Sequence, residues 1–139
     1  MNKTRSCGGG RSRWSIALAL ALLPAPMPAL AADFPFEQEM QMDVKPMPGG
    51  KRVPMLEVLP DGRAIIDLWC KSGDGRAEVK DDTIKFTLGL MREEGCTPER
   101  VARDEEMAPA LEAVTQWRIE DDILVLVGPA ELRYRLSSH

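Results

Sequence analysis

Histidine is almost missing from this sequence: the chain of 139 residues contains one, His139, and it is the last residue. A thiol nucleophile usually needs a neighbouring base to take its proton, and the end of a chain is a poor place to hold that base. A zinc site takes three or four ligands, drawn mainly from cysteine and histidine. The composition therefore argues against thiol catalysis and against a zinc site.

Cysteine is scarce as well, with three residues, Cys7, Cys70 and Cys96. None of them stands in a C-x-x-C pair, which is the spacing typical of a redox dithiol. The sequence therefore gives no support to a redox-active pair.

The sequence also lacks an apolar run long enough to cross a membrane. The apolar segment at 14–23 has about ten residues, whereas a spanning helix needs about 20. A basic segment precedes it and the pattern Ala29-Leu30-Ala31, with small residues at its first and third positions, follows it. This is the order of a secretory signal peptide; an uncleaved anchor is the alternative. We predict cleavage after Ala31 or Ala32. Because no cysteine stands at that point, we expect no lipid anchor and no stable membrane attachment.

Once residues 1–31 are removed, the remaining chain also has no excess of positive charge. All 22 acidic residues remain, with 14 of the 18 lysines and arginines, so the net charge becomes −8. A nucleic-acid partner would favour the opposite sign, and none is expected. The remaining 108 residues suit one domain. We divide it into an N-terminal strand with a Pro/Gly loop at 32–53 and a core at 54–139.

What the mature chain does contain is alternation of apolar and polar residues, which predicts half-buried strands. The motif at 71–76, KSGDGR, predicts a turn because of its two glycines. We expect about seven short strands, drawn from the segments 36–44, 55–58, 63–70, 77–80, 83–88, 117–120, 123–127 and 132–136.

One helix is expected, because Met107, Leu111 and Val114 recur at helical spacing. Pro109 has no N–H and fits only a first turn, so the helix should begin near Met107, with a separate short turn at 97–99. The prediction is a mainly β (α+β) fold: a small antiparallel, strongly curled sheet or partial lipocalin-like barrel, with the helix packed over an opening. An interior without a cavity would be filled by Ile66, Leu68, Ile84, Phe86, Val125 and Tyr134.

Cys70 continues the apolar face of the strand at 63–70, and Cys96 is its only partner after signal cleavage. An even number of cysteines in an oxidising compartment predicts a disulfide. Free or regulatory thiols and a metal site remain as alternatives.

Other residues suggest sites but have simpler interpretations. Met40 and Met42 could bind Cu(I) through their thioethers, although methionine commonly fills gaps in a core. The motif at 71–76 lacks the acidic ligands of a calcium loop. The carboxylates of 93–94 and 104–106 could serve acid–base chemistry, although acidic runs of this kind usually form solvated surface. We therefore predict no catalytic residue, no metal ligand and no cofactor.

Several of these segments resemble the META domain, the family of the heat-shock protein HslJ. Cys70 followed by Gly75 resembles that family's cysteine strand and turn, and residues 90–98 resemble its second cysteine region. The helix near 106–114 and the strands WRIEDDILVLV and LRYRL resemble its ending. The resemblance covers about residues 54–136, and it implies an exported bacterial domain with a small barrel-like fold and no established catalytic residues.

The expected function is accordingly non-enzymatic: a periplasmic or secreted protein with a binding or scaffolding role in the cell envelope or in envelope stress. The partner would be an unidentified envelope protein or a small ligand, and the protein a monomer. The alternative is a small-ligand or copper carrier that uses the barrel interior or the Met40/Met42 face.

Overall fold

A computed structural model describes residues 8, 10 and 32–136 of the chain. Cys7, Ala31, His139 and most of the expected signal peptide lie outside the described residues. The described strands and helix all belong to one compact unit, Ala31–His139.

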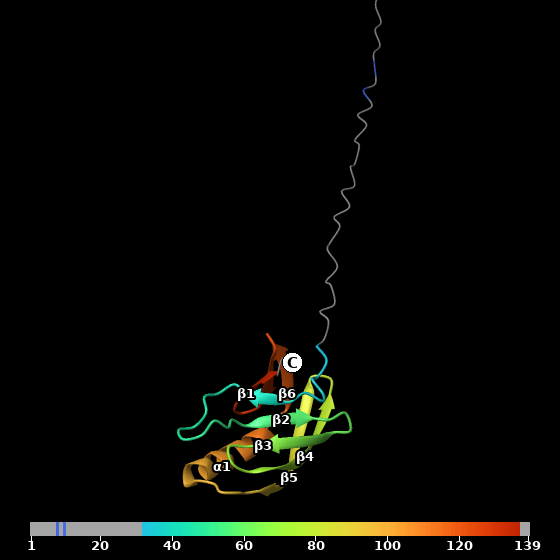
Figure 1. Cartoon of the computed structure of the whole chain (residues 1–139). Coiled ribbons are helices and arrows are strands. Elements are labelled where there is room, and N and C mark those ends of the chain that lie inside the picture. The colour runs from blue at the N-terminus through green and yellow to red at the C-terminus, as the bar shows by residue number, and fades with distance from the viewer. Residues whose placement is uncertain (1–7, 9, 11–31, 137–139) are drawn as a thin grey trace, which may run out of the picture. The chain divides into compact units, whose positions relative to one another are not determined.

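This unit is an antiparallel barrel of eight strands with one helix (Figure 1). Each strand pairs with the next along the chain, and the last strand pairs with the first, with Met42 opposite Tyr134. The predicted fold class is confirmed, and the barrel is closed. Its elements are β1 (Met40–Met42), β2 (Met55–Val58), β3 (Arg63–Asp67), β4 (Ser72–Lys80), β5 (Thr83–Arg92), α1 (Pro98–Glu112), β6 (Gln116–Glu120), β7 (Ile123–Val127) and β8 (Leu132–Leu136).

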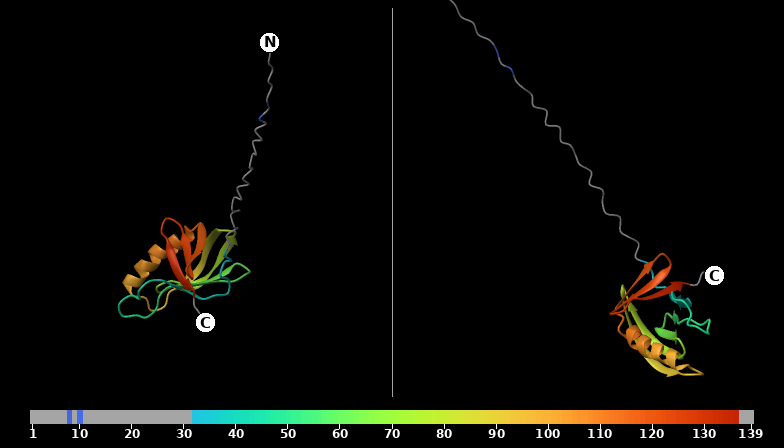
Figure 2. Two further views of the ribbon diagram at one scale, coloured as in Figure 1. Left: turned by 90° about the horizontal axis from the view of Figure 1, so that it is seen from above. Right: turned by 90° about the vertical axis from the view of Figure 1, so that its left-hand side faces the viewer.

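The barrel is closed most weakly between β5 and β6, which pair only at Thr83 and Gln116. An unpaired strand edge leaves N–H groups without partners. Helix α1 lies along this part of β5 (Figure 2), and the Glu112 carboxylate accepts the Leu88 N–H at 3.0 Å. The helix thus covers the edge that the short strand β6 leaves open.

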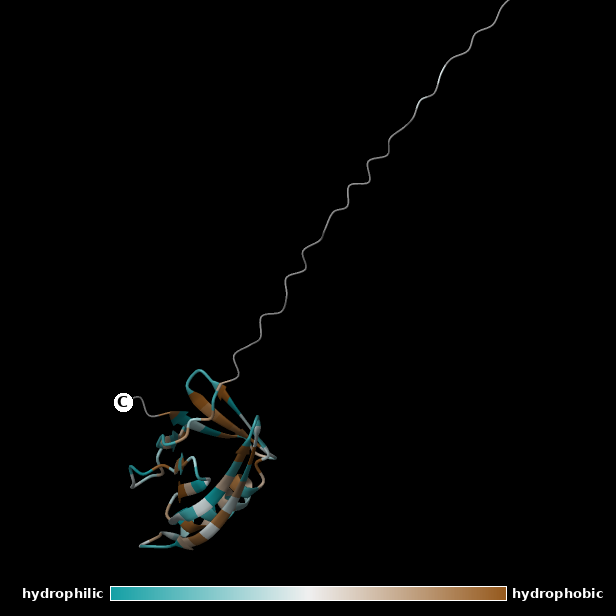
Figure 3. Ribbon diagram, turned by 90° about the vertical axis from the view of Figure 1, so that its right-hand side faces the viewer, coloured by the Kyte–Doolittle hydropathy of each residue, from teal (hydrophilic) through white to brown (hydrophobic). Residues whose placement is uncertain are grey.

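The interior is filled by side chains from the strands and from α1. Buried residues alternate with exposed ones along much of β4 and β5, and the long curved strands in Figure 3 accordingly alternate between hydrophobic and hydrophilic colours. The helix contributes Met107 and Leu111, and Val114, which follows the helix end at Glu112, is buried beside them. The largest fully buried side chains are Tyr134, Phe86, Met40, Leu56, Ile66, Leu68, Ile84, Leu111, Leu124 and Leu126.

Val125 was expected inside the barrel, and this expectation is wrong. Its neighbours Leu124 and Leu126 point into the core, so Val125 faces outward between Arg118 of β6 and Arg133 of β8. It is nevertheless fully buried, because long arginine side chains cover apolar surface with their stems.

The two arginines that flank Val125 are held by ion pairs with Glu120 and Glu131. Hydrogen bonds from Arg118, and then from Arg133, lower the pKa of both glutamates. The same bonds, to Glu120 first and then Glu131, raise the pKa of both arginines. The outer face of β6–β8 is therefore a fixed charge network and not a row of free side chains.

Helix α1 begins at Pro98, nine positions before Met107, so the predicted start is wrong. Thr97 is the residue before the first turn and Pro98 occupies that turn, where its missing N–H costs nothing. Pro109 lies inside the helix instead. Both Pro109 and Glu105, whose carbonyl loses an intrahelical bond, are exposed, so water can replace the missing donor. The separate turn expected at 97–99 is this helix's first turn.

The turn predicted at 71–76 is also displaced. The chain reverses at Leu68–Lys71, where the Leu68 N–H donates to the Lys71 carbonyl, and β4 begins at Ser72. Gly73 and Gly75 therefore belong to β4, and the strand has a β-bulge between them. A Cβ at Gly75 would stand 2.6 Å from the Thr87 carbonyl oxygen of β5, so this close approach of the strands requires glycine.

The strand expected at 36–44 is shorter, since β1 covers only Met40–Met42. Glu37 has a φ of 59°, which breaks the extended chain before β1. Phe34, which precedes this break, is buried and packs edge-on against Trp117, with ring centroids 5.1 Å apart. The residues that follow the predicted cleavage point therefore belong to the folded domain.

Candidate functional site

Cys70 and Cys96 are joined by a disulfide, as predicted, with their Cα atoms 5.7 Å apart. Cys70 is 8% exposed and continues the buried row of β3. Cys96 lies directly before Thr97, the residue that precedes α1. The bond therefore ties the β3–β4 turn to the beginning of the helix. In this structure the two residues are neither free thiols nor metal ligands.

Asp104 of α1 faces the same turn from the other side. It is 1% exposed, and its carboxylate accepts the backbone N–H groups of Trp69 (2.6 Å), Cys70 (3.0 Å) and Lys71 (2.7 Å). A buried charge is tolerated when it is fully hydrogen-bonded. This carboxylate is already occupied by three donors, so its arrangement is that of an anchor for the turn.

Asp104 was assigned to solvated surface together with Glu105 and Glu106, and for Asp104 this is wrong. The two glutamates are exposed, as expected. Asp104 stands three positions before Met107 and seven before Leu111, so it falls on the inward stripe of the helix. That spacing was a usable signal, but only with a helix that begins before residue 104.

The other predicted carboxylate pair, Glu93 and Glu94, lies in the exposed loop before α1. Glu93 pairs with Lys71 at 3.6 Å, and the carbonyl oxygen of Glu94 lies 3.6 Å from the Cys70 sulfur. The structure does not gather these two glutamates with Asp104 into one cleft, since Asp104 is buried and they are exposed.

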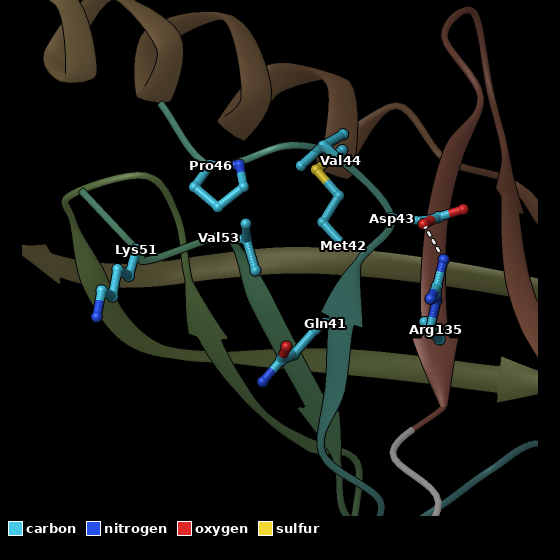
Figure 4. A pocket seen from close by; sticks show the side chains of 8 residues that line it. All are labelled: Gln41, Met42, Asp43, Val44, Pro46, Lys51, Val53 and Arg135. Atoms are coloured by element: carbon cyan, nitrogen blue, oxygen red, sulfur yellow. Dashed lines mark hydrogen bonds and ion pairs between the residues drawn. The ribbon is translucent and has the colours of Figure 1, made fainter. Parts of the chain in front are cut away.

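A hollow of about 310 Å³ opens beside β1, between the loop that follows it and β8. Figure 4 shows Met42, Val44 and Pro46 gathered on one side of this hollow, while Lys51 and Gln41 extend away from them at two separate places. Val53, Asp43 and Arg135 complete the lining. We call this feature the β1 hollow.

The charges around the β1 hollow are unequal. Asp43 is paired with Arg135, as the dashed line in Figure 4 shows. Lys51 makes no salt bridge to any residue in 32–136. The guanidinium of Arg100 lies against Gly50 of the same loop, where a Cβ would collide with it. One acid, already paired, therefore faces an excess of cations.

The two methionines proposed for copper have different surroundings. Met40 is fully buried in the core, whereas Met42 is half-buried and lines the β1 hollow. Their sulfurs thus do not share an exposed face. Within residues 32–136, no group of three or more His, Cys, Asp and Glu side chains is placed to hold a metal ion.

A smaller hollow of about 220 Å³ lies over β3 and β4, between Ile65, Asp67 and Asp74. Asp67 is paired with Arg52 at 3.3 Å. The β1 hollow was not identifiable from sequence, because the barrel closure brings Arg135 of β8 beside β1. The smaller hollow depends on the registers of β3, β4 and β5.

In the part of the chain that the structure describes, no helix combines the length and the apolar character that crossing a bilayer requires. A model of the META domain family matches residues 38–138. No curated protein sequence matches the chain.

Two solved structures resemble this one. An NMR structure of a protein from Burkholderia xenovorans is similar with a TM-score of 0.60 and 15% identity, over 85% of this chain and 100% of that one. A DUF4847-family protein from Bacteroides vulgatus gives a TM-score of 0.49 and 11% identity, over 62% of this chain and 60% of that one. At such identities, the first similarity supports the fold alone.

Proposed function

Because the chain belongs to the META domain family, we propose that it is a non-enzymatic binding or scaffolding protein of the bacterial cell envelope, active in the envelope or in its response to stress. The observation that carries this proposal is the filled barrel: its interior holds fully buried side chains such as Tyr134 and Phe86. Binding would then use the outer surface, and the β1 hollow is the larger of the two hollows described above.

The disulfide supports the envelope as the location. Disulfides persist in oxidising compartments such as the periplasm and are rare in the cytosol. The buried carboxylate of Asp104 supports a structural and not a chemical role for the cysteine region, since three N–H groups occupy it.

No observation favours the copper-carrier alternative, because Met40 lies in the core. The hypothesis of a small-ligand carrier remains, but the ligand would bind at the β1 hollow on the surface instead of in the barrel interior.

The test is photo-crosslinking in living bacteria that express the full-length chain. A photoreactive residue replaces Val44, which is exposed and lines the β1 hollow; the matched control replaces Thr87, an exposed residue of β5. We expect a discrete adduct with an envelope component from position 44 and none from position 87. Equal adducts from both positions, or adducts only with cytosolic proteins, would contradict the proposal.

A further inference from the structure

We infer that the β1 hollow binds a small amphipathic carboxylate of the fatty-acid kind, with the carboxylate at Lys51 and the apolar part against Met42, Val44 and Pro46. This inference rests on the proposed binding function and names the ligand class of that site.

The size and lining of the hollow limit the size and polarity of the ligand that it can bind. Its volume of about 310 Å³ stands at the lower end of the range of about 300–1,000 Å³ for ligand sites. Four of its lining residues, Met42, Val44, Pro46 and Val53, are apolar. Val44 is also one of the large hydrophobic side chains that the fold leaves exposed, at 41%. A short acyl chain suits such a surface.

The charges around the hollow limit the kind of head group that it can bind. Residues 44–56 contain no acid, but they contain Lys45, Lys51 and Arg52. This is the longest acid-free stretch in a mature chain whose net charge is −8. Arg52 is paired with Asp67, so the unpaired cation in the lining is Lys51. A local positive site on an acidic protein attracts an anion.

The polar groups of the hollow suit a carboxylate better than a phosphate. A phosphate monoester carries a charge of about −1.5 to −2 at pH 7, whereas a carboxylate carries a single negative charge. Arg135 lines the hollow, but Asp43 already engages its guanidinium. The remaining cation of the lining is the ammonium of Lys51, and the Gln41 amide lies well apart from it in Figure 4. This single ammonium matches one singly charged head group.

The walls of the hollow are held by backbone hydrogen bonds. The Met42 N–H donates to the Pro54 carbonyl at 2.8 Å, and the Asp43 N–H donates to the Arg133 carbonyl at 2.8 Å. Within the loop, the Gly50 N–H donates to the Met47 carbonyl at 3.1 Å. These bonds fix both ends of the loop to the barrel, so the site is formed before a ligand arrives.

The experiment is an NMR titration of the disulfide-bonded protein, expressed from its full-length sequence, with sodium octanoate. We expect shifts confined to residues 41–53 and 135, with a Kd on the order of 1 mM, as suits a ligand of about ten heavy atoms. Octan-1-ol and octylammonium, which have the same chain without the anion, should bind at least fivefold more weakly.

Lys51→Gln should weaken octanoate binding at least fivefold, and the matched variant Lys85→Gln, on an exposed residue of β5, should leave it unchanged. Four results would overturn the inference: no shifts up to 20 mM octanoate, about the Kd times 20; shifts elsewhere on the barrel; equal binding of octanol; or tighter binding of octyl phosphate. Because the crosslinking at Val44 does not depend on this ligand, its outcome separates a wrong ligand class from a wrong binding function.

Discussion

The carboxylate of Asp104 accepts the backbone N–H of Cys70 at 3.0 Å, although the two residues are 34 positions apart in the sequence. The disulfide reaches the same turn from Cys96, at the beginning of the same helix. One covalent bond and one buried carboxylate thus fasten α1 to the β3–β4 turn independently. They hold the helix over the part of β5 that lacks a neighbouring strand.

Replacement of Asp104 by alanine should destabilise the protein by about 3 kcal/mol, because three N–H groups would lose their buried acceptor. This is a large part of the stability of about 5–15 kcal/mol that a domain of this size has. Urea unfolding measures the difference. The exposed neighbour is the control: Glu105→Ala should change stability by no more than about 0.5 kcal/mol. Equal effects of the two substitutions would show that Asp104 is not an anchor.

The disulfide and the buried carboxylate of Asp104 differ in how far the sequence could predict them. Cys70 was placed correctly because the period of two in β3 continues to it, and the pairing with Cys96 followed from the predicted compartment. The spacing of Asp104 from Met107 and Leu111 indicates burial only if the helix begins before residue 104, and Pro109 argued for a later start. Its role arises from three backbone N–H groups that the turn at 68–71 presents together, and those depend on tertiary structure.

Pro109→Ala should stabilise the protein by about 2 kcal/mol. The substitution restores an N–H to an intrahelical bond, and proline in a helix interior costs about 3 kcal/mol, partly offset by the restriction it places on the unfolded chain. Thermal unfolding followed by circular dichroism checks this. Pro98→Ala is the control and should not stabilise, because Pro98 is in the first turn. A gain of the same size at both prolines would contradict the helix boundaries given above.

Burial raises the pKa of Tyr134 above its ordinary value of 10.0. The folded protein therefore keeps the phenol proton at a pH where the unfolded chain has lost it. The contribution to stability is complete below about pH 10 and is lost as the pH rises above that value. Denaturant unfolding between pH 9 and 12, the interval around this value, should show the loss, and Tyr134→Phe should reduce its slope. A variant with the same slope as the native protein would count against Tyr134 as the cause.

Replacing Cys70 and Cys96 together by alanine should lower stability by roughly 3–4 kcal/mol, the value expected for closing a loop of about 27 residues. The hydrogen bonds from the turn to Asp104 should persist in this variant. We therefore expect the barrel to stay folded at about 25 °C, the temperature to which these stability values refer. Hydrogen exchange at the backbone amides of positions 69, 70 and 71 measures this persistence. Immediate exchange of all three amides would mean that the carboxylate alone does not hold the turn.

The barrel strands were largely predictable, whereas the places where strands approach closely were not. Apolar alternation identifies β3, β5 and β8, because one face of each is buried. Gly73 and Gly75 resembled a turn in the sequence, but they belong to β4, which bulges as it approaches β5. Val125 was assigned to the interior because it is apolar; its burial under Arg118 and Arg133 required knowledge of the cross-strand register.

The central claim, a disulfide-stabilised domain that functions after export, is tested most directly by the intact mass of the protein recovered from the periplasmic fraction of bacteria expressing the full-length chain. We predict a chain that begins at residue 32 or 33 and has a mass two hydrogens below that of its reduced form. A chain found in the cytosol with residues 1–31 attached and both Cys70 and Cys96 reduced would contradict the account.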